Sequence, residues 1–282
     1  KVKNHEKTFS KQVMERKNVM ENLNAEVEPI FVVIADNNFD KIVRRFAASL
    51  EEKFTFEEPS GVKNSIFFLT DTEKIDKLKN AVKNVQGIIA DGHHRATAIR
   101  ELYKETHNNF WKYAISYITS IYDAGLMIGG VDRLVYGINF EANLAKIKNL
   151  FDVVDEKSII DSDLIQIYSN GHVYSITPKQ FIIDELFGKN FPLSTEIINR
   201  ILFNEVFGLT DQEIEKKVGY IYNATDAINS VDKHECNFAI IVPPWHKDVF
   251  LSLILENKIL PQKSTYFYPK IPSGIAIYFR PS

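Results

Sequence analysis

Cysteine is the scarcest residue of this sequence: Cys236 is the only one among 282 residues. A single cysteine excludes an internal disulfide framework and a cysteine-rich zinc site, and it is typical of the reducing cytoplasm. The sequence also lacks an apolar run of the roughly 18 residues that suggest a membrane span, and its polar N-terminus lacks the apolar centre of a signal peptide. We therefore expect a cytoplasmic protein without a membrane segment.

An excess of basic charge is absent as well. Lys and Arg together number 34 against 37 Asp and Glu, which gives a net charge of -3. Nucleic-acid binders usually carry a basic surplus to neutralise phosphates, so no nucleic-acid partner is expected. The sequence contains no HExxH, CxxC or GxxxxGK[ST] string, and zinc hydrolases and P-loop proteins are therefore unsupported.

What is present is ordinary globular composition, with 45% hydrophobic, 12% aromatic and 25% charged residues. At roughly 150 residues per domain, the length suits one large domain or two small ones. Helical periodicity is expected over 8–23, 39–54, 73–82, 141–151, 179–188, 194–207, 225–233 and 247–257. Strands are expected over 30–35, 65–70, 86–91, 111–122, 126–137 and 238–243, at 274–279, and as a hairpin with a central Asn-Gly over 164–177. This interleaving predicts an α+β (mixed α/β) fold, with one lobe over 1–140 and a second α/β lobe over 141–282.

The segment 88-IIADGHHRATAIRE-101 carries the strongest chemical signal. An apolar strand leads into Asp91-Gly92, and His93-His94-Arg95 stand where an Ala-rich helix begins. The first N–H groups of a helix lack intrahelical partners and attract anions, and Arg95 and the two histidines could add donors. Asp91 could hold Mg²⁺ beside such an anion. A helix capped by Asp91 with exposed histidines explains the same residues equally well.

Four strings in chain order resemble those of the bacterial domain-of-unknown-function family 1015. They are 4-NHEKT-8 with 29-PIFVVI-34, then ADGHHRATA, then 122-YDAGLMIGGVDRLVYG-137, and 262-QKSTYFYPKIPSGIAIY-278. The family's "THR" is Val131-Asp132-Arg133 here, so a role for the histidine of that string does not transfer to Asp132. Typical members are longer at the N-terminus, so we expect a fragment or a short member that lacks that block.

The DGHHR turn is also similar to the phosphate-binding motif of the ParB/sulfiredoxin superfamily. This similarity implies a ParB/sulfiredoxin-like phosphate-binding lobe over 1–140. The free L-serine kinases of that superfamily pair such a turn with an upstream His-Glu, whose Glu is the catalytic base. His5-Glu6 matches this pair by type and order. Sulfiredoxin itself needs a reactive cysteine inside the turn, and this sequence has histidine there.

The resemblance implies a small-molecule kinase that transfers a phosphoryl group to a hydroxyl compound, with free L-serine as the expected acceptor. Transfer to a hydroxyl needs a base, a cationic cradle, a metal and contacts that fix the acceptor. Glu6 with His5 is the expected catalytic pair, residues 91–95 the cradle, and Mg²⁺ the metal. The donor would be ATP, ADP or pyrophosphate. Lys263, Ser264, Thr265 and Lys270 are expected to contact the same ligand, although packing of the aromatic residues between them would also explain that string.

Two alternatives stay open. A ParB-like regulatory protein would bind a nucleotide at the same turn without kinase activity, and a truncated, inactive member would retain only the fold. The oligomeric state is also open.

Overall fold

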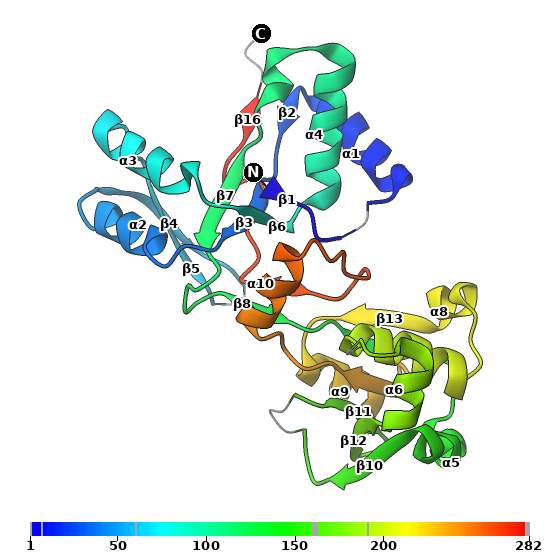
Figure 1. Ribbon diagram of the computed structural model, residues 1–282. Helices are drawn as coiled ribbons and strands as arrows, with labels where there is room; N and C mark the ends of the chain where they lie inside the picture. The colour runs from blue at the N-terminus through cyan, green and yellow to red at the C-terminus, as the bar shows by residue number, and fades with distance from the viewer. Residues whose placement is uncertain (1, 7, 60, 160–162, 191, 280–282) are drawn as a thin grey trace. The chain divides into compact units, whose positions relative to one another are not determined.

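The computed structural model describes all residues except 1, 7, 60, 160–162, 191 and 280–282 (Figure 1). The chain forms two compact units. The first comprises residues 1–126, 250–259 and 269–282, and the second comprises 127–249 and 260–268. This division differs from the expected lobes at 1–140 and 141–282, because the chain returns to the first unit twice after residue 249.

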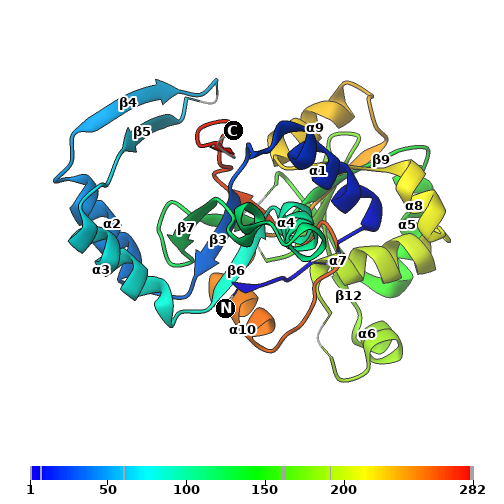
Figure 2. The same cartoon turned by 90° about the horizontal axis from the view of Figure 1, so that it is seen from above.

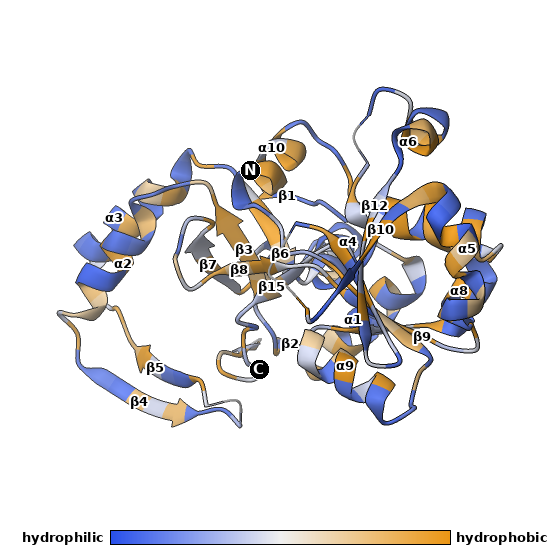
Figure 3. Ribbon diagram, turned by 90° about the horizontal axis from the view of Figure 1, so that it is seen from below, coloured by the Kyte–Doolittle hydropathy of each residue, from blue (hydrophilic) through white to orange (hydrophobic). Residues whose placement is uncertain are grey.

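The first unit is built on a four-stranded mixed sheet with the order β1-β6-β3-β7. Its strands are β1 (Val2–Lys3), β6 (Gly87–Asp91), β3 (Ile30–Ile34) and β7 (Ser116–Ser120). β3 is antiparallel to β6 and parallel to β7. Every residue of β3 is buried, and Figure 3 colours this strand as hydrophobic. A continuous apolar run is expected for a strand that is covered on both faces.

Helices α1 (Ser10–Leu23) and α4 (His93–Thr106) pack together in this unit. Their apolar residues join alternate residues of β3 in one buried cluster, because successive side chains of a strand point to opposite faces of its sheet. The cluster contains Val13, Met20, Ile30, Val32, Ile34, Phe39, Ile89, Ala98, Ile99, Leu102, Phe110 and Trp111. This core holds the β6–α4 connection, where the predicted phosphate cradle lies, against the sheet.

Two further helices, α2 (Phe39–Ala47) and α3 (Thr72–Lys83), are joined by a separate two-stranded sheet of β4 (Glu52–Glu57) and β5 (Lys63–Phe67). Figure 2 shows this hairpin beyond the two helices. α3 begins where the Asp71 carboxylate accepts hydrogen bonds from the N–H groups of Glu73 and Lys74, which is a standard N-cap. The first unit also contains the 3-10 turn η1 (Asn109–Lys112) and the pair of β2 (Ala25–Glu26) with β16 (Tyr278–Phe279). Helix α10 (Lys247–Leu255) belongs to this unit from Phe250 onward.

The second unit is built on a six-stranded sheet with the order β10-β12-β11-β14-β9-β13. All of its pairs are antiparallel. The strands are β10 (Phe151–Glu156), β12 (His172–Pro178), β11 (Ile165–Ser169), β14 (Phe238–Ile241), β9 (Asp132–Val135) and β13 (Val218–Ile221). A small pair, β8 (Met127–Gly129) with β15 (Tyr266–Tyr268), belongs to the same unit.

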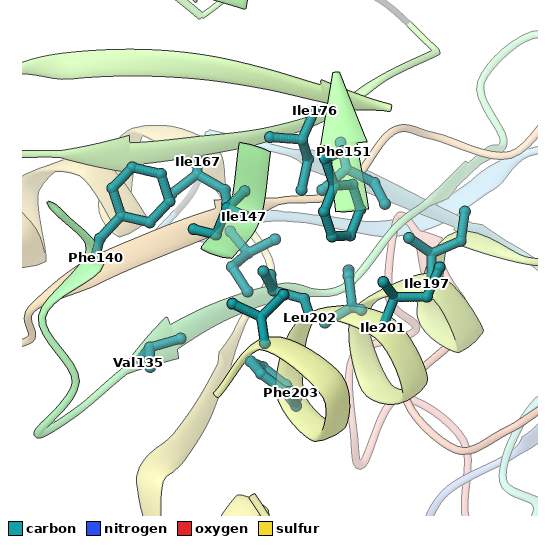
Figure 4. Packing of buried hydrophobic residues seen from close by; sticks show 14 of the residues in the cluster. Val135, Phe140, Ile147, Phe151, Ile167, Ile176, Ile197, Ile201, Leu202 and Phe203 are labelled. Carbon is teal, nitrogen blue, oxygen red and sulfur yellow. The ribbon is translucent and has the colours of Figure 1, made fainter. Parts of the chain in front are cut away.

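One face of this sheet carries the main core of the second unit (Figure 4). Ile201 and Leu202 project from the π-helix η2 (Ile197–Val206) toward Ile147 and Phe151, and Phe203 joins the same cluster from another side of the helix. The remaining helices are α5 (Phe140–Leu150), α6 (Gln180–Phe187), α7 (Ser194–Glu196), α8 (Asp211–Lys217) and α9 (Ala224–Asp232).

The α+β class is confirmed, and so is the hairpin at Asn170-Gly171. The expected helix over 39–54 is too long, because α2 ends at Ala47 and β4 follows. Of the expected strand over 274–279, only Tyr278–Phe279 pairs. No helix of the described residues combines the length and the apolar character that crossing a membrane requires.

Candidate functional site

The turn between β6 and α4 is shaped by Gly92. Its φ of +90° lies in the left-handed region that glycine adopts without strain. A Cβ at this position would lie 2.9 Å from Nη2 of Arg95, so a side chain there would displace the guanidinium. The Gly92 carbonyl accepts the N–H of Ala96 at 2.9 Å, and no side chain caps the helix. The first N–H groups of α4 are therefore available for an anion.

His5 and His93 form a buried pair beside this turn. Nδ1 of His5 and Nε2 of His93 lie 3.2 Å apart, and the rings meet edge to face. Burial is the main cause that lowers the pKa of His5 to about 3 and that of His93 to about 4. Both rings are therefore neutral at neutral pH, and one N–H lies between them. The sequence predicts His93 as a donor to a ligand and His5 as a member of the catalytic pair. In the structure these two rings contact each other and attach the N-terminal segment to α4.

A second contact attaches the same segment to His94. The Phe9 N–H donates to Nε2 of His94 at 3.2 Å, and the two rings stack. Nε2 of His94 therefore accepts, and the proton of the neutral ring lies on Nδ1. Glu6 is half-buried between the anchors at His5 and Phe9. The carboxylate predicted as a base is thus on a segment fixed to the first turn of α4.

Asp91 and Arg95 belong to a network of charged groups. Arg95 donates to Oε2 of Glu28 at 2.7 Å, to the Pro29 carbonyl at 3.1 Å and to Oδ2 of Asp91 at 3.3 Å. Nζ of Lys270 lies 3.3 Å from the other Asp91 oxygen. Burial raises the pKa of Asp91, but Lys270 and Arg95 outweigh that effect and leave it below its usual value.

This network borders a polar pocket of about 270 Å³ within the first unit. Its lining residues are Glu28, Pro29, Phe31, Asp91, Arg95, Lys270, Ile271 and Ser273. Nε of Arg95 is buried, and none of the described residues offers it a hydrogen-bond acceptor. A buried donor without a partner is costly, so the guanidinium is not fully satisfied by its present neighbours.

The string 263-KSTYFYPK-270 is divided between the two units. Lys270 lies in the first unit with the turn, whereas Lys263, Ser264 and Thr265 belong to the second. Nζ of Lys263 contacts the Tyr222 hydroxyl at 3.2 Å. The Ser264 hydroxyl is buried and donates to the Pro261 carbonyl at 2.6 Å.

Sequence reasoning missed Glu28, Phe9 and the role of His5 as the partner of His93. Glu28 precedes a buried strand and has no spacing relation to the turn that could have identified it. The described residues contain no group of three or more His, Cys, Asp or Glu side chains placed to hold a metal ion.

Solved structures show what this fold resembles. A free serine kinase in complex with AMP aligns with a TM-score of 0.51 and 14% sequence identity, covering 97% of this chain and 86% of the kinase. A variant of a free serine kinase in complex with ADP aligns with a TM-score of 0.51 and 12% identity, with the same coverage. SbnI from Staphylococcus aureus, truncated at its C-terminus, aligns with a TM-score of 0.50 and 10% sequence identity, covering 97% of this chain and 82% of SbnI. The chain has the fold of these proteins.

The family is established by sequence. Residues 1–194 match the family described as protein of unknown function DUF1015, and the chain belongs to that family. No curated protein matches the sequence.

Proposed function

We propose that this protein is a small-molecule kinase that transfers a phosphoryl group from ATP, ADP or pyrophosphate to a hydroxyl compound, with free L-serine as the acceptor. The likeness in fold to free serine kinases supports the class of reaction. We also propose that the first unit is a ParB/sulfiredoxin-like phosphate-binding lobe and that the enzyme works in the cytoplasm.

The observation that carries this proposal is the double attachment of the Glu6 segment to α4. His5 is bound to His93, and the Phe9 N–H is bound to His94. Glu6 therefore lies near the helix end where an anion is favoured by unpaired N–H groups and by the helix dipole. A carboxylate beside a phosphate seat is the arrangement that proton removal from an acceptor hydroxyl requires.

In the proposed reaction, the Glu6 carboxylate takes the proton of the acceptor hydroxyl. The hydroxyl oxygen forms a bond to the terminal phosphorus, and the bond from phosphorus to the bridging oxygen breaks. The donor leaves as ADP from ATP, as AMP from ADP, or as phosphate from pyrophosphate. His5 and His93 act as positioning residues in this scheme, because both are buried and bind each other.

The cradle would consist of the first N–H groups of α4, with Arg95 and Lys270 as cations and His94 at its edge. Mg²⁺ bound to donor phosphates needs only one or two protein carboxylates, and Asp91 is the carboxylate of the turn. When bound, the ion would neutralise phosphate charge. Lys263, Ser264 and Thr265, which belong to the second unit, stay proposed as ligand contacts on the resemblance of their string alone.

The test is formation of O-phosphoserine from L-serine, Mg²⁺ and each donor separately, followed by mass spectrometry. Glu6→Gln should lower turnover by about 10²–10⁴-fold, the usual contribution of a general base, and leave donor affinity unchanged. Glu15→Gln, which alters an exposed carboxylate on α1, is the matched control and should keep full activity.

Two results would contradict the proposal. Equal turnover by the Glu6→Gln variant would remove Glu6 as the base. Donor binding without phosphoserine in the unaltered protein would instead favour the nucleotide-binding regulator.

A further inference from the structure

The six-stranded sheet of the second unit has two unequal faces. Ile167, Phe238 and Ile240 point to the face that carries the main core. The opposite face is covered by α9, whose Ala227 and Val231 form a much smaller apolar cluster with Ile241. Among the described residues, fewer buried apolar side chains therefore gather on this second face than on the first.

Polar side chains cross this second face in register. Gln166 pairs with Ser175 on one side and with Ile241 on the other. The register that pairs Ile240 with Arg133 sets Asp132 beside Ile241. Cross-strand neighbours share a face of a sheet, so Asp132, Gln166 and Ser175 form one row. Asp132 is 5% exposed, and Gln166 and Ser175 are 2% exposed each.

Part of this row lines a pocket of about 310 Å³ that lies entirely within the second unit. Its lining residues are Gly129, Gly130, Asp132, Ile159, Leu164, Gln166, Ala224, Ile241, Val242, Pro243 and Pro244. The volume is at the lower end for small-molecule sites, and apolar walls with a few polar groups are typical of them.

Asp132 is the only ionisable residue among those lining residues. Its Oδ1 accepts the Val242 N–H at 2.8 Å, and no described Lys or Arg forms an ion pair with it. The neighbouring Arg133 donates to the Lys263 carbonyl at 3.3 Å and lies over the Tyr220 ring, so it lowers the pKa of Asp132 only through its charge at a distance. Burial raises the pKa of Asp132 to about 6, which reflects the cost of an ionised carboxylate here.

We propose that this pocket binds a small organic ammonium ion with a short aliphatic body. The ammonium group would donate to the Asp132 carboxylate and compensate its charge, and the aliphatic body would lie against the isoleucine, valine and proline walls. A carboxylate on the ligand is disfavoured, because none of the lining residues is Lys, Arg or His. This proposal does not depend on the kinase function.

Four probes of matched shape separate the ligand classes: isoamylamine, isoamyl alcohol, isovalerate and L-leucine. The full chain is titrated with each probe while the backbone amide NMR signals of Gly129, Gly130 and Val242 are followed. We expect saturable shifts with isoamylamine, at least tenfold weaker binding of the alcohol and of L-leucine, and no binding of isovalerate.

Two variants test the assignment. Asp132→Asn keeps the shape and the acceptor for Val242, and it should weaken isoamylamine binding at least tenfold, the usual value of a charged hydrogen bond. Asp152→Asn, an exposed change in β10 of the same sheet, should leave binding unchanged. Ala224→Leu should block the pocket without altering Asp132.

The proposal is overturned if the amine and the alcohol bind equally, if Asp132→Asn binds as the unaltered chain does, or if no probe gives a saturable shift at these amides.

Discussion

The turn of the first unit contains the half-buried Asp91, and the pocket of the second unit contains the buried Asp132. The surroundings of these two aspartates shift their pKa values in opposite directions. Asp91 is held by two cations, Lys270 and Arg95, and its pKa falls. Asp132 has one backbone N–H, and its pKa rises to about 6. Two cations therefore form ion pairs with Asp91, whereas among the described residues Arg133 acts on Asp132 only at a distance and burial outweighs it. Loss of charge should cost stability in the first region and little in the second.

The largest effect is expected from acid on the buried His5–His93 pair. Both pKa values lie below the ordinary 6.5, so the stability that the neutral rings provide is complete above pH 6.5. It is lost progressively as the pH falls from there through about 4 and then 3. Glu26 acts in the opposite sense, since burial raises its pKa to about 7 and its contribution is lost as the pH rises through that value.

The two effects are separated by comparing the unaltered chain with His5→Asn. Between pH 6.5 and 4 the free energy of unfolding should fall by a few kcal/mol less in the variant than in the unaltered chain. Each unit contains one tryptophan, Trp111 in the first and Trp245 in the second, so a Trp245→Phe background reports the first unit by fluorescence. Parallel pH profiles with and without His5 would contradict this account.

Arg95→Ala should have the next largest effect. It leaves Glu28 and Asp91 without their shared cation, and we expect a loss of about 2 kcal/mol, below the value for a fully buried pair because both carboxylates are partly exposed. Urea unfolding followed at Trp111 measures it. Arg16→Ala, on the exposed side of α1, is the control and should change the stability by less than about 0.5 kcal/mol. An equal loss of stability in both variants would show that the charged network around Arg95 does not cause the loss.

Gly92→Ala should cost about 1–2 kcal/mol for the left-handed backbone, and more because the new Cβ meets Arg95. Gly171→Ala is the matched control in the second unit, with a φ of +81° and no atom within 4 Å of the Cβ. The excess loss at Gly92 measures the contact with Arg95. Equal losses in the two variants would mean that the guanidinium moves aside freely.

The smallest effect is expected from Asp132→Asn. The amide oxygen can still accept the Val242 N–H, and the cost of burying a charge disappears. We expect the stability of the second unit, followed at Trp245, to change by less than about 1 kcal/mol and not to fall. A loss of stability as large as that of Arg95→Ala would contradict the proposed difference between the two regions.

The sequence could predict a site whose residues are contiguous, but not one whose residues are brought together by the fold. The turn at Asp91–Arg95 is contiguous, so a strand, a glycine and a helix start can be recognised together. Glu28 joins it only through the fold, and no spacing relates it to the turn. Lys270 is expected at the same ligand from its string, but its ion pair with Asp91 comes from the fold. The hairpin at Asn170-Gly171 sets Gln166 opposite Ser175, but Asp132 joins their row only through the long-range pairing of β14 with β11 and β9, which no local pattern encodes. The sequence does not reveal the start of β4, because Phe54 follows Phe46 and Leu50 at the four-residue spacing of a helix.

The central claim is that the first turn of α4 seats the phosphates of the donor beside Glu6. A titration with ADP, followed by the backbone amide signals of residues 92–95, tests it most directly. We expect saturable shifts at these amides with the unaltered chain and with Glu6→Gln alike. A titration in which these four amides stay unmoved while ADP binds elsewhere would contradict the account.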